Sequence, residues 1–365
     1  MSDDLRRVYG HSNAKRSREA PASDVTKRLV GREKSLFYQT GGLSGHTGWS
    51  FPLVCAIFNE SKVRIALSFV LFFVARMTVH GDYREFCKLA IDPSIDSAVK
   101  RTAEGTLKEF PKLTADNLAI SVIDLTKSDT VRRADYRGDA SFYPASLVKL
   151  FFMVETFHQG HMTPEIERAL REMIRVSDND AAAFLLDVLT DTASGSELEG
   201  KSLEQFIDRR RKLNRYFASL GYDISAMIKP WSFGPFGRDM QIMGENLINR
   251  NRASANAVAS LLLWIVRRQA VSPEASEAML ALLERPLAPP RPEENQVNGF
   301  FGEALPATSR LWSKEGDTSE VRHDAAYVEL PDGRKFIVVI LTRGAADDKT
   351  LLPAIGKHLL AEVDR

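Results

Sequence analysis

The sequence predicts an α+β protein, in which an antiparallel five-stranded sheet is flanked by terminal helices and joined to an all-helical lobe. Three observations support this fold class. Helical patterns at 94–110 and 351–363 stand at the two ends of the folded part. Two strand patterns follow the first of these helices, and three strand patterns precede the last one. A long helical stretch separates the two groups of strands. The simplest assembly pairs the early hairpin with the late strands in one sheet.

The first half of the folded part begins with the helix at 94–110, which Pro111 ends. Strands are expected at 118–125 and 131–137, with a turn between them. Helices follow at 145–158, 164–176 and 181–189, and the charged stretch 202–220 predicts one surface helix.

The second half begins with a connection at 221–249, and a connection of this length in a compact domain is usually functional or mobile. Apolar periodicity predicts helices at 255–266 and 272–283, and prolines break the chain at 286–292. Strands are expected at 311–314, 325–330 and 336–341. The last two are joined by Pro331-Asp332-Gly333-Arg334, a hairpin signal.

Composition excludes several function classes. The 365 residues are 44% hydrophobic and 27% charged, as in soluble globular proteins, and the net charge of +1 argues against nucleic-acid binding through phosphate neutralisation. The two cysteines and seven histidines have no spacing typical of a zinc site. We therefore expect chemistry without a metal or another cofactor.

The N-terminal region differs from the rest. Residues 1–61 are polar without apolar periodicity and are expected to be disordered, or to lie upstream of the true start. Residues 62–81 start with basic residues and contain an apolar run at 65–75, which resembles a signal peptide. The alternative is a buried or membrane-associated helix. We expect a periplasmic or secreted bacterial protein, with a possible membrane tether at 65–75 and a catalytic domain at 82–365.

Ser146 and Lys149 form the first candidate site. In a helix that starts near Ala145 they lie one turn apart on the same face. A lysine whose pKa is lowered by burial can take the proton of a serine hydroxyl and make it a nucleophile. Alone, the Ser-x-x-Lys pattern is short enough to occur by chance.

Three short motifs follow one another along the chain. They are Ser146-Leu147-Val148-Lys149, Ser177-Asp178-Asn179 and Lys314-Glu315-Gly316. In this order and on these elements they resemble the motifs of the penicillin-recognising serine hydrolases, above all the class A β-lactamases. The resemblance covers about 94–365.

The resemblance implies a role for each motif residue. Ser146 would be acylated, Lys149 would act as base, and Ser177 would pass a proton to the leaving nitrogen. The backbone N–H groups of Ser146 and Asp317 would form the oxyanion hole. The residues that would bind substrate are Asn179, Lys314, Gly316 and Asp317.

Other interpretations of these residues stay open. Asp178 could cap a helix, and Lys314 could be a solvated lysine at a strand edge. His323 and Asp324 invite comparison with a catalytic triad, but we favour a role in orienting the strand or lining the pocket floor.

The sequence departs from the family pattern at three places. Glu315 stands where the family has threonine, and a carboxylate pointing into the site would repel the carboxylate of a penicillin. Ser146 and Ser177 are 31 residues apart (177 − 146), fewer than in class A enzymes. Glu245, in Glu245-Asn246-Leu247-Ile248-Asn249, is a candidate for the glutamate that activates the deacylating water, but isoleucine stands where the family motif has leucine and the spacing from Asn179 differs from the family's. Alternatively, Glu245 is a solvent-facing loop residue.

These features predict a serine hydrolase of the class A β-lactamase type that opens a β-lactam or a related amide through an acyl-serine intermediate. The alternatives are a peptidoglycan DD-peptidase and a penicillin-sensing or penicillin-binding domain without turnover. The expected partner is a small β-lactam or a peptidoglycan-derived amide. We expect a monomer.

Overall fold

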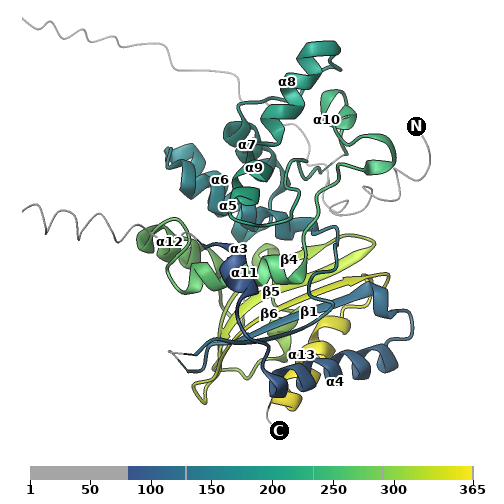
Figure 1. Cartoon of the computed structure of the whole chain (residues 1–365), viewed down its shortest axis with the longest axis vertical. Coiled ribbons are helices and arrows are strands. Elements are labelled where there is room, and N and C mark those ends of the chain that lie inside the picture. Colours follow the sequence, from purple (N-terminus) through teal and green to yellow (C-terminus); the bar gives the residue numbers. More distant parts are fainter. Residues whose placement is uncertain (1–80, 128–129, 233, 289–291, 364–365) are drawn as a thin grey trace, which may run out of the picture. The chain divides into compact units, whose positions relative to one another are not determined.

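The computed structural model describes residues 81–363 except 128–129, 233 and 289–291 (Figure 1). The predicted extension at 1–61 and the apolar run at 65–75 lie outside the described residues. Within the described part, the helices are too short or too polar to cross a membrane. The proposed domain boundaries therefore stay predictions.

A six-stranded antiparallel sheet forms the centre of the fold. Its order is β2-β1-β6-β5-β4-β3. The strands are β1 (Leu118–Asp124), β2 (Arg132–Tyr136), β3 (Glu284–Arg285), β4 (Arg310–Asp317), β5 (Val321–Glu329) and β6 (Lys335–Arg343). The early hairpin pairs with the late strands, as predicted, but the number of strands is six rather than five. The extra strand, β3, has only two residues, too few for an alternating pattern to reveal it.

Helices cover both faces of the sheet. The terminal helices α4 (Pro93–Glu109) and α13 (Leu351–Val363) lie together on one face, where Val99 and Ile355 join a cluster with Ile120 and Ile340 (Figure 1). Helix α11 (Ala255–Val266) packs on the other face. Because β1 is covered on both faces, all seven of its residues are buried.

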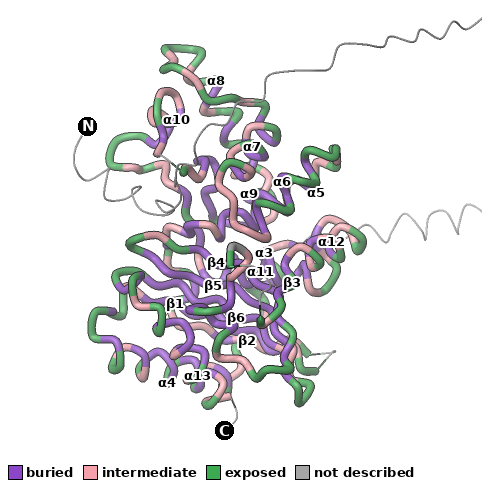
Figure 2. The backbone as a smooth tube through the Cα atoms, turned by 180° about the vertical axis from the view of Figure 1, so that it is seen from behind, coloured by how far each residue is buried: buried purple, intermediate pink, exposed green. Residues whose placement is uncertain are grey.

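The remaining helices build the lobe next to β4. They are α5 (Val148–Gln159), α6 (Pro164–Arg175), α7 (Asn179–Thr190), α8 (Gly200–Arg210), α9 (Lys212–Ser219), α10 (Arg238–Gln241) and α12 (Pro273–Leu283), and a short α3 (Tyr83–Cys87) precedes α4. The single helix expected at 202–220 is divided at Arg211 into α8 and α9. Buried residues run through the strands, whereas outer helices alternate buried and exposed residues (Figure 2).

Buried charges hold the long connection at 221–249 to this lobe. The Arg210 guanidinium is fully buried and pairs with Asp187 at 2.8 Å and Asp239 at 3.0 Å. Asp187 also forms an ion pair with Lys229, whose Nζ lies 2.5 Å from Asp187 Oδ2. The network ties α7 and α8 to Lys229 and Asp239 of the connection, so the connection is anchored by paired charges as well as by apolar packing.

Candidate active site

Ser146 lies where the chain enters α5. The expected helix from Ala145 begins as a 3-10 turn, Ala145–Leu147, and becomes α-helical at Val148. Ala145 has a left-handed φ of 46°, which costs a non-glycine residue of the order of 1 kcal/mol. Ser146 is half-buried. Backbone strain directly before a candidate nucleophile is typical of functional sites.

Lys149, one helical turn further, is fully buried. Its Nζ donates to the backbone oxygen of Ser177 at 2.6 Å, to Asn179 Oδ1 at 2.8 Å and to Ser177 Oγ at 3.2 Å. Burial and the nearby Lys314 ammonium lower the pKa of Lys149 to about 7. Near neutral pH a large fraction of Lys149 is therefore uncharged and able to accept a proton.

Ser177 stands between two lysines. Its Oγ lies 3.2 Å from Lys149 Nζ and 2.8 Å from Lys314 Nζ. Its φ of 59° is also left-handed. The first, second and third motifs, far apart in the sequence, thus meet at one hydroxyl group.

Lys314 is fully buried in β4, so the interpretation as a solvated edge lysine is wrong. Its Nζ donates to Ser177 Oγ, to the backbone oxygen and Oε1 of Glu315 at 3.0 and 2.9 Å, and to Gln296 Oε1 at 3.3 Å. The lysine is held in place by contacts from the Ser177 turn, from Gln296 and from Glu315 of its own strand.

Arg285 and Gln296 fix the Ser177 turn to the sheet. The last carbonyls of a helix lack partners within it. At the end of α6, Arg285 donates to the Ile174 oxygen at 2.6 Å and Gln296 to the Ile174 and Arg175 oxygens at 3.0 and 2.9 Å. Since Gln296 also accepts from Lys314, the two side chains set the distance between Ser177 and β4.

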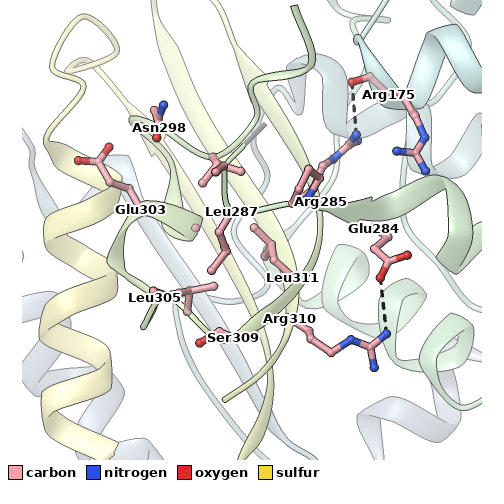
Figure 3. A pocket seen from close by; sticks show the side chains of 15 residues that line it. Arg175, Glu284, Arg285, Leu287, Asn298, Glu303, Leu305, Ser309, Arg310 and Leu311 are labelled. Atoms are coloured by element: carbon pink, nitrogen blue, oxygen red, sulfur yellow. Dashed lines mark hydrogen bonds and ion pairs between the residues drawn. The ribbon is translucent and has the colours of Figure 1, made fainter. Parts of the chain in front are cut away.

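Figure 3 shows Arg285 reaching from β3 to the carbonyl of Arg175, beside a pocket lined in part by Leu287, Leu305 and Leu311. Sequence reasoning missed Arg285 and Gln296. The first is in a two-residue strand and the second follows a proline-rich break, and neither position carries a recognisable motif.

Gly316 brings β4 against the candidate nucleophile. A Cβ at this position would lie 2.9 Å from the Pro144 oxygen and 3.1 Å from the backbone nitrogen of Ser146. Only glycine allows this approach without displacement of one of the two segments. The next residue, Asp317, therefore directly follows the contact with the Ser146 backbone, and its role with Ser146 as oxyanion-hole donor stays a prediction.

Glu315 lies inside the site. It is buried, and although burial alone would raise its pKa, the Lys314 ammonium and its hydrogen bond lower the pKa to about 2. Asp317 as a whole residue is exposed, but loss of water around its carboxyl group and the Glu315 carboxylate raise its pKa to about 6. The strand thus adds negative charge where the family has a neutral threonine.

His323 has a structural role. Its Nδ1 accepts from the backbone N–H of Thr342 at 3.1 Å, so its Nε2 carries the proton and donates to the Tyr143 oxygen at 2.9 Å. Burial lowers the pKa of His323 to about 4, so the ring is neutral at pH 7. Asp324 instead accepts from the backbone of Phe301. His323 therefore holds the segment before the nucleophile, Asp324 holds Phe301, and the two do not form a triad.

The second motif also caps a helix. Asp178 accepts from the backbone of Ala181 at 2.6 Å as the N-cap of α7. Asn179 donates to the Trp231 oxygen at 3.4 Å, so the connection at 221–249 borders the site.

Glu245 begins the 3-10 turn Glu245–Leu247, and its side chain is exposed. Among the described residues, the hydrogen bonds that join Lys149, Ser177 and Lys314 do not include Glu245. Its part in deacylation stays a prediction.

A model of the β-lactamase enzyme family matches residues 159–363. The chain belongs to this family. The matched range includes Ser177, Asn179 and Lys314, whereas Ser146 and Lys149 precede it and are assigned by their motif and position. No curated protein matches the chain.

Solved structures share the fold of this β-lactamase family member. PBP-A aligns with a TM-score of 0.54 and 18% identity, over 75% of this chain and 98% of that one. A β-lactamase from Sphaerobacter thermophilus aligns with a TM-score of 0.52 and 18% identity, over 73% and 97%. A PBP-A variant in an acyl-enzyme complex with penicillin G aligns with a TM-score of 0.52 and 18% identity, over 73% of this chain and 95% of that one. At these identities the likeness concerns the fold.

Proposed function

We propose that the protein is a serine hydrolase that opens a β-lactam or a related amide through an acyl-Ser146 intermediate. The observation that carries the proposal is the position of the Ser177 hydroxyl, 3.2 Å from Lys149 Nζ and 2.8 Å from Lys314 Nζ. A hydroxyl between a lysine that can be neutral and a second lysine that is paired with Glu315 can pass a proton.

The reaction proceeds in two parts. Neutral Lys149 takes the proton of Ser146, whose Oγ forms a bond to the amide carbonyl carbon. The backbone N–H groups of Ser146 and Asp317 stabilise the oxyanion. The carbon–nitrogen bond then breaks, and the proton reaches the leaving nitrogen through Ser177. Water finally hydrolyses the ester, and its second proton returns to Ser146.

A penicillin-binding domain without turnover is the second candidate. The exposure of Glu245 favours it, because an exposed side chain outside the lysine cluster is poorly suited to hold a deacylating water. In this case the acyl-enzyme persists.

Two probes test the proposal on the full chain. A fluorophosphonate, which reports a nucleophilic serine whatever the substrate, is expected to label the wild-type protein and not Ser146→Ala, as read by intact mass. A chromogenic cephalosporin then separates the candidates, because colour without an adduct indicates turnover and a lasting adduct indicates a binding domain. Absence of both fluorophosphonate labelling and any reaction with the cephalosporin would remove Ser146 as nucleophile.

We also propose that the protein is exported, which suits a substrate from the cell wall or the medium. The support is the basic and apolar pattern at 62–81. N-terminal sequencing of the natural protein tests this: a mature start near Asp82 agrees with export, and an intact Met1 contradicts it.

A further inference from the structure

The ammonium group of Lys314 is already fully engaged. It has three N–H donors. Four acceptors surround it at 2.8 to 3.3 Å: Ser177 Oγ, Glu315 Oε1, the Glu315 backbone oxygen and Gln296 Oε1. A substrate carboxylate could gain a hydrogen bond from Lys314 only by displacing one of them. The Glu315 carboxylate, 2.9 Å away, also neutralises the charge of the lysine.

Two carboxylates occupy the end of β4 that meets Ser146. Glu315 is 6% exposed, and its Oε2 has no hydrogen-bond partner among the described residues. Asp317 is exposed two residues further, beyond the Gly316 contact with the Ser146 backbone. This short segment therefore holds one lysine and two acidic residues, and its charge at neutral pH is negative.

Four described cations near this segment are engaged elsewhere, among them Arg322, which lies opposite Asp317 in the β4–β5 register and donates to the backbone oxygens of Gly299 and Ala346. Lys149 donates to Ser177 and Asn179. Arg285 is buried and donates to backbone carbonyls at the end of α6. The Arg250 guanidinium lies over the Tyr143 ring, 3.6 Å from its centroid.

We propose that the Ser146 site selects amides whose leaving side is uncharged or cationic, and discriminates against the carboxylate that penicillins carry there. The inference rests on the proposed function, because it concerns the substrate of that same nucleophile. Glu315 is its main determinant, since it pairs Lys314 from within the strand, and Asp317 adds to the effect at the exposed end.

A series of benzylpenicillin derivatives separates charge from reactivity. The free acid, the methyl ester and the choline ester share one β-lactam ring and differ in the charge beside its nitrogen. In each case Ser146 Oγ bonds to the carbonyl carbon, the ring carbon–nitrogen bond breaks, and the serine proton ends on that nitrogen. The adduct therefore has the mass of the whole compound. The acylation rate of each compound is measured by intact mass. It is divided by the rate at which hydroxide ion opens the ring of the same compound, so that differences in intrinsic reactivity cancel.

We expect the free acid to acylate the wild-type protein at least about tenfold more slowly than the methyl ester, and the choline ester to be at least as fast as the methyl ester. Glu315→Gln is expected to reduce the disadvantage of the free acid by about tenfold. Asp317→Asn is at an exposed position and should shift the ratio of the free-acid rate to the methyl-ester rate in the same direction. It tests the inference if Glu315→Gln does not fold. Glu329→Gln makes the same charge change at the opposite end of the β4–β5 pair, and the ratio stays unchanged.

An equal or faster reaction of the free acid with the wild-type protein overturns the inference. So does an unchanged ratio in both Glu315→Gln and Asp317→Asn, which would reduce Glu315 to a structural partner of Lys314. If the fluorophosphonate labels Ser146 but no penicillin derivative reacts, the inference fails while the nucleophile stands. If no probe reacts with Ser146, the proposed function itself fails.

Discussion

Replacement of Lys314 by methionine should move the pH dependence of acylation. The positive charge of Lys314 helps to lower the pKa of Lys149 to about 7, after burial, which is the larger cause. Only neutral Lys149 can accept the Ser146 proton, so the acylation rate rises with pH through this pKa. In Lys314→Met the pKa rises, and the acid limb of the profile shifts to higher pH.

The structure gives the size of this shift. The two lysine nitrogens lie 3.2 and 2.8 Å from the same oxygen, so they are separated by at most the sum of these distances, about 6 Å. At an effective dielectric constant of about 20, two unit charges at that distance repel by about 2.8 kcal/mol, or about two pKa units. The Glu315 carboxylate raises the pKa of Lys149 in the wild-type protein as well, so it does not add to the difference between the two proteins.

The assay is the rate of acylation by benzylpenicillin methyl ester between pH 5 and pH 10, followed by acid quench and intact mass. The midpoint is the pH at which the acylation rate reaches half its maximum. It does not depend on the maximal rate, so it can be read even if loss of the Lys314 contact with Ser177 slows the reaction. We expect the midpoint of the pH profile to rise from about pH 7 by about two units. Lys335→Met, at the far end of β6, is the matched control and leaves it in place. An unchanged or lower midpoint in Lys314→Met would refute the coupling between the lysines.

Three further predictions follow from the contacts. Gly316→Ala should lower acylation about a hundredfold, because the new Cβ displaces the backbone at Ser146; an unchanged rate contradicts the oxyanion-hole assignment. Arg210→Met should lower the free energy of unfolding in urea by about 3 kcal/mol, because Asp239 is left as a buried carboxylate without its cation; a loss below about 1 kcal/mol speaks against this. Glu245→Gln should leave the rate of deacylation unchanged, because the side chain is exposed, whereas a variant that stalls as the acyl adduct would identify Glu245 as the base.

Local patterns in the sequence predict most of the fold. Apolar periodicity locates α11 and α13 with their observed bounds, and the hairpin signal at Pro331-Asp332-Gly333-Arg334 joins β5 to β6. These features depend on the spacing of neighbouring residues, which determines how a helix or strand buries one side. The break at Arg211 and the two-residue β3 depend instead on packing with distant segments.

The sequence also determines the order and chemistry of the three motifs, because residue type and spacing are local properties. Their meeting at the Ser177 hydroxyl is decided by tertiary structure. Arg285 and Ile174, whose hydrogen bond holds the Ser177 turn, are 111 residues apart in the chain. Only the fold shows that Lys314 is buried and that Glu315 is its partner, since the surroundings of a side chain are made by segments far away in sequence. The same fold leaves Glu245 exposed, although its sequence context resembles that of a catalytic glutamate.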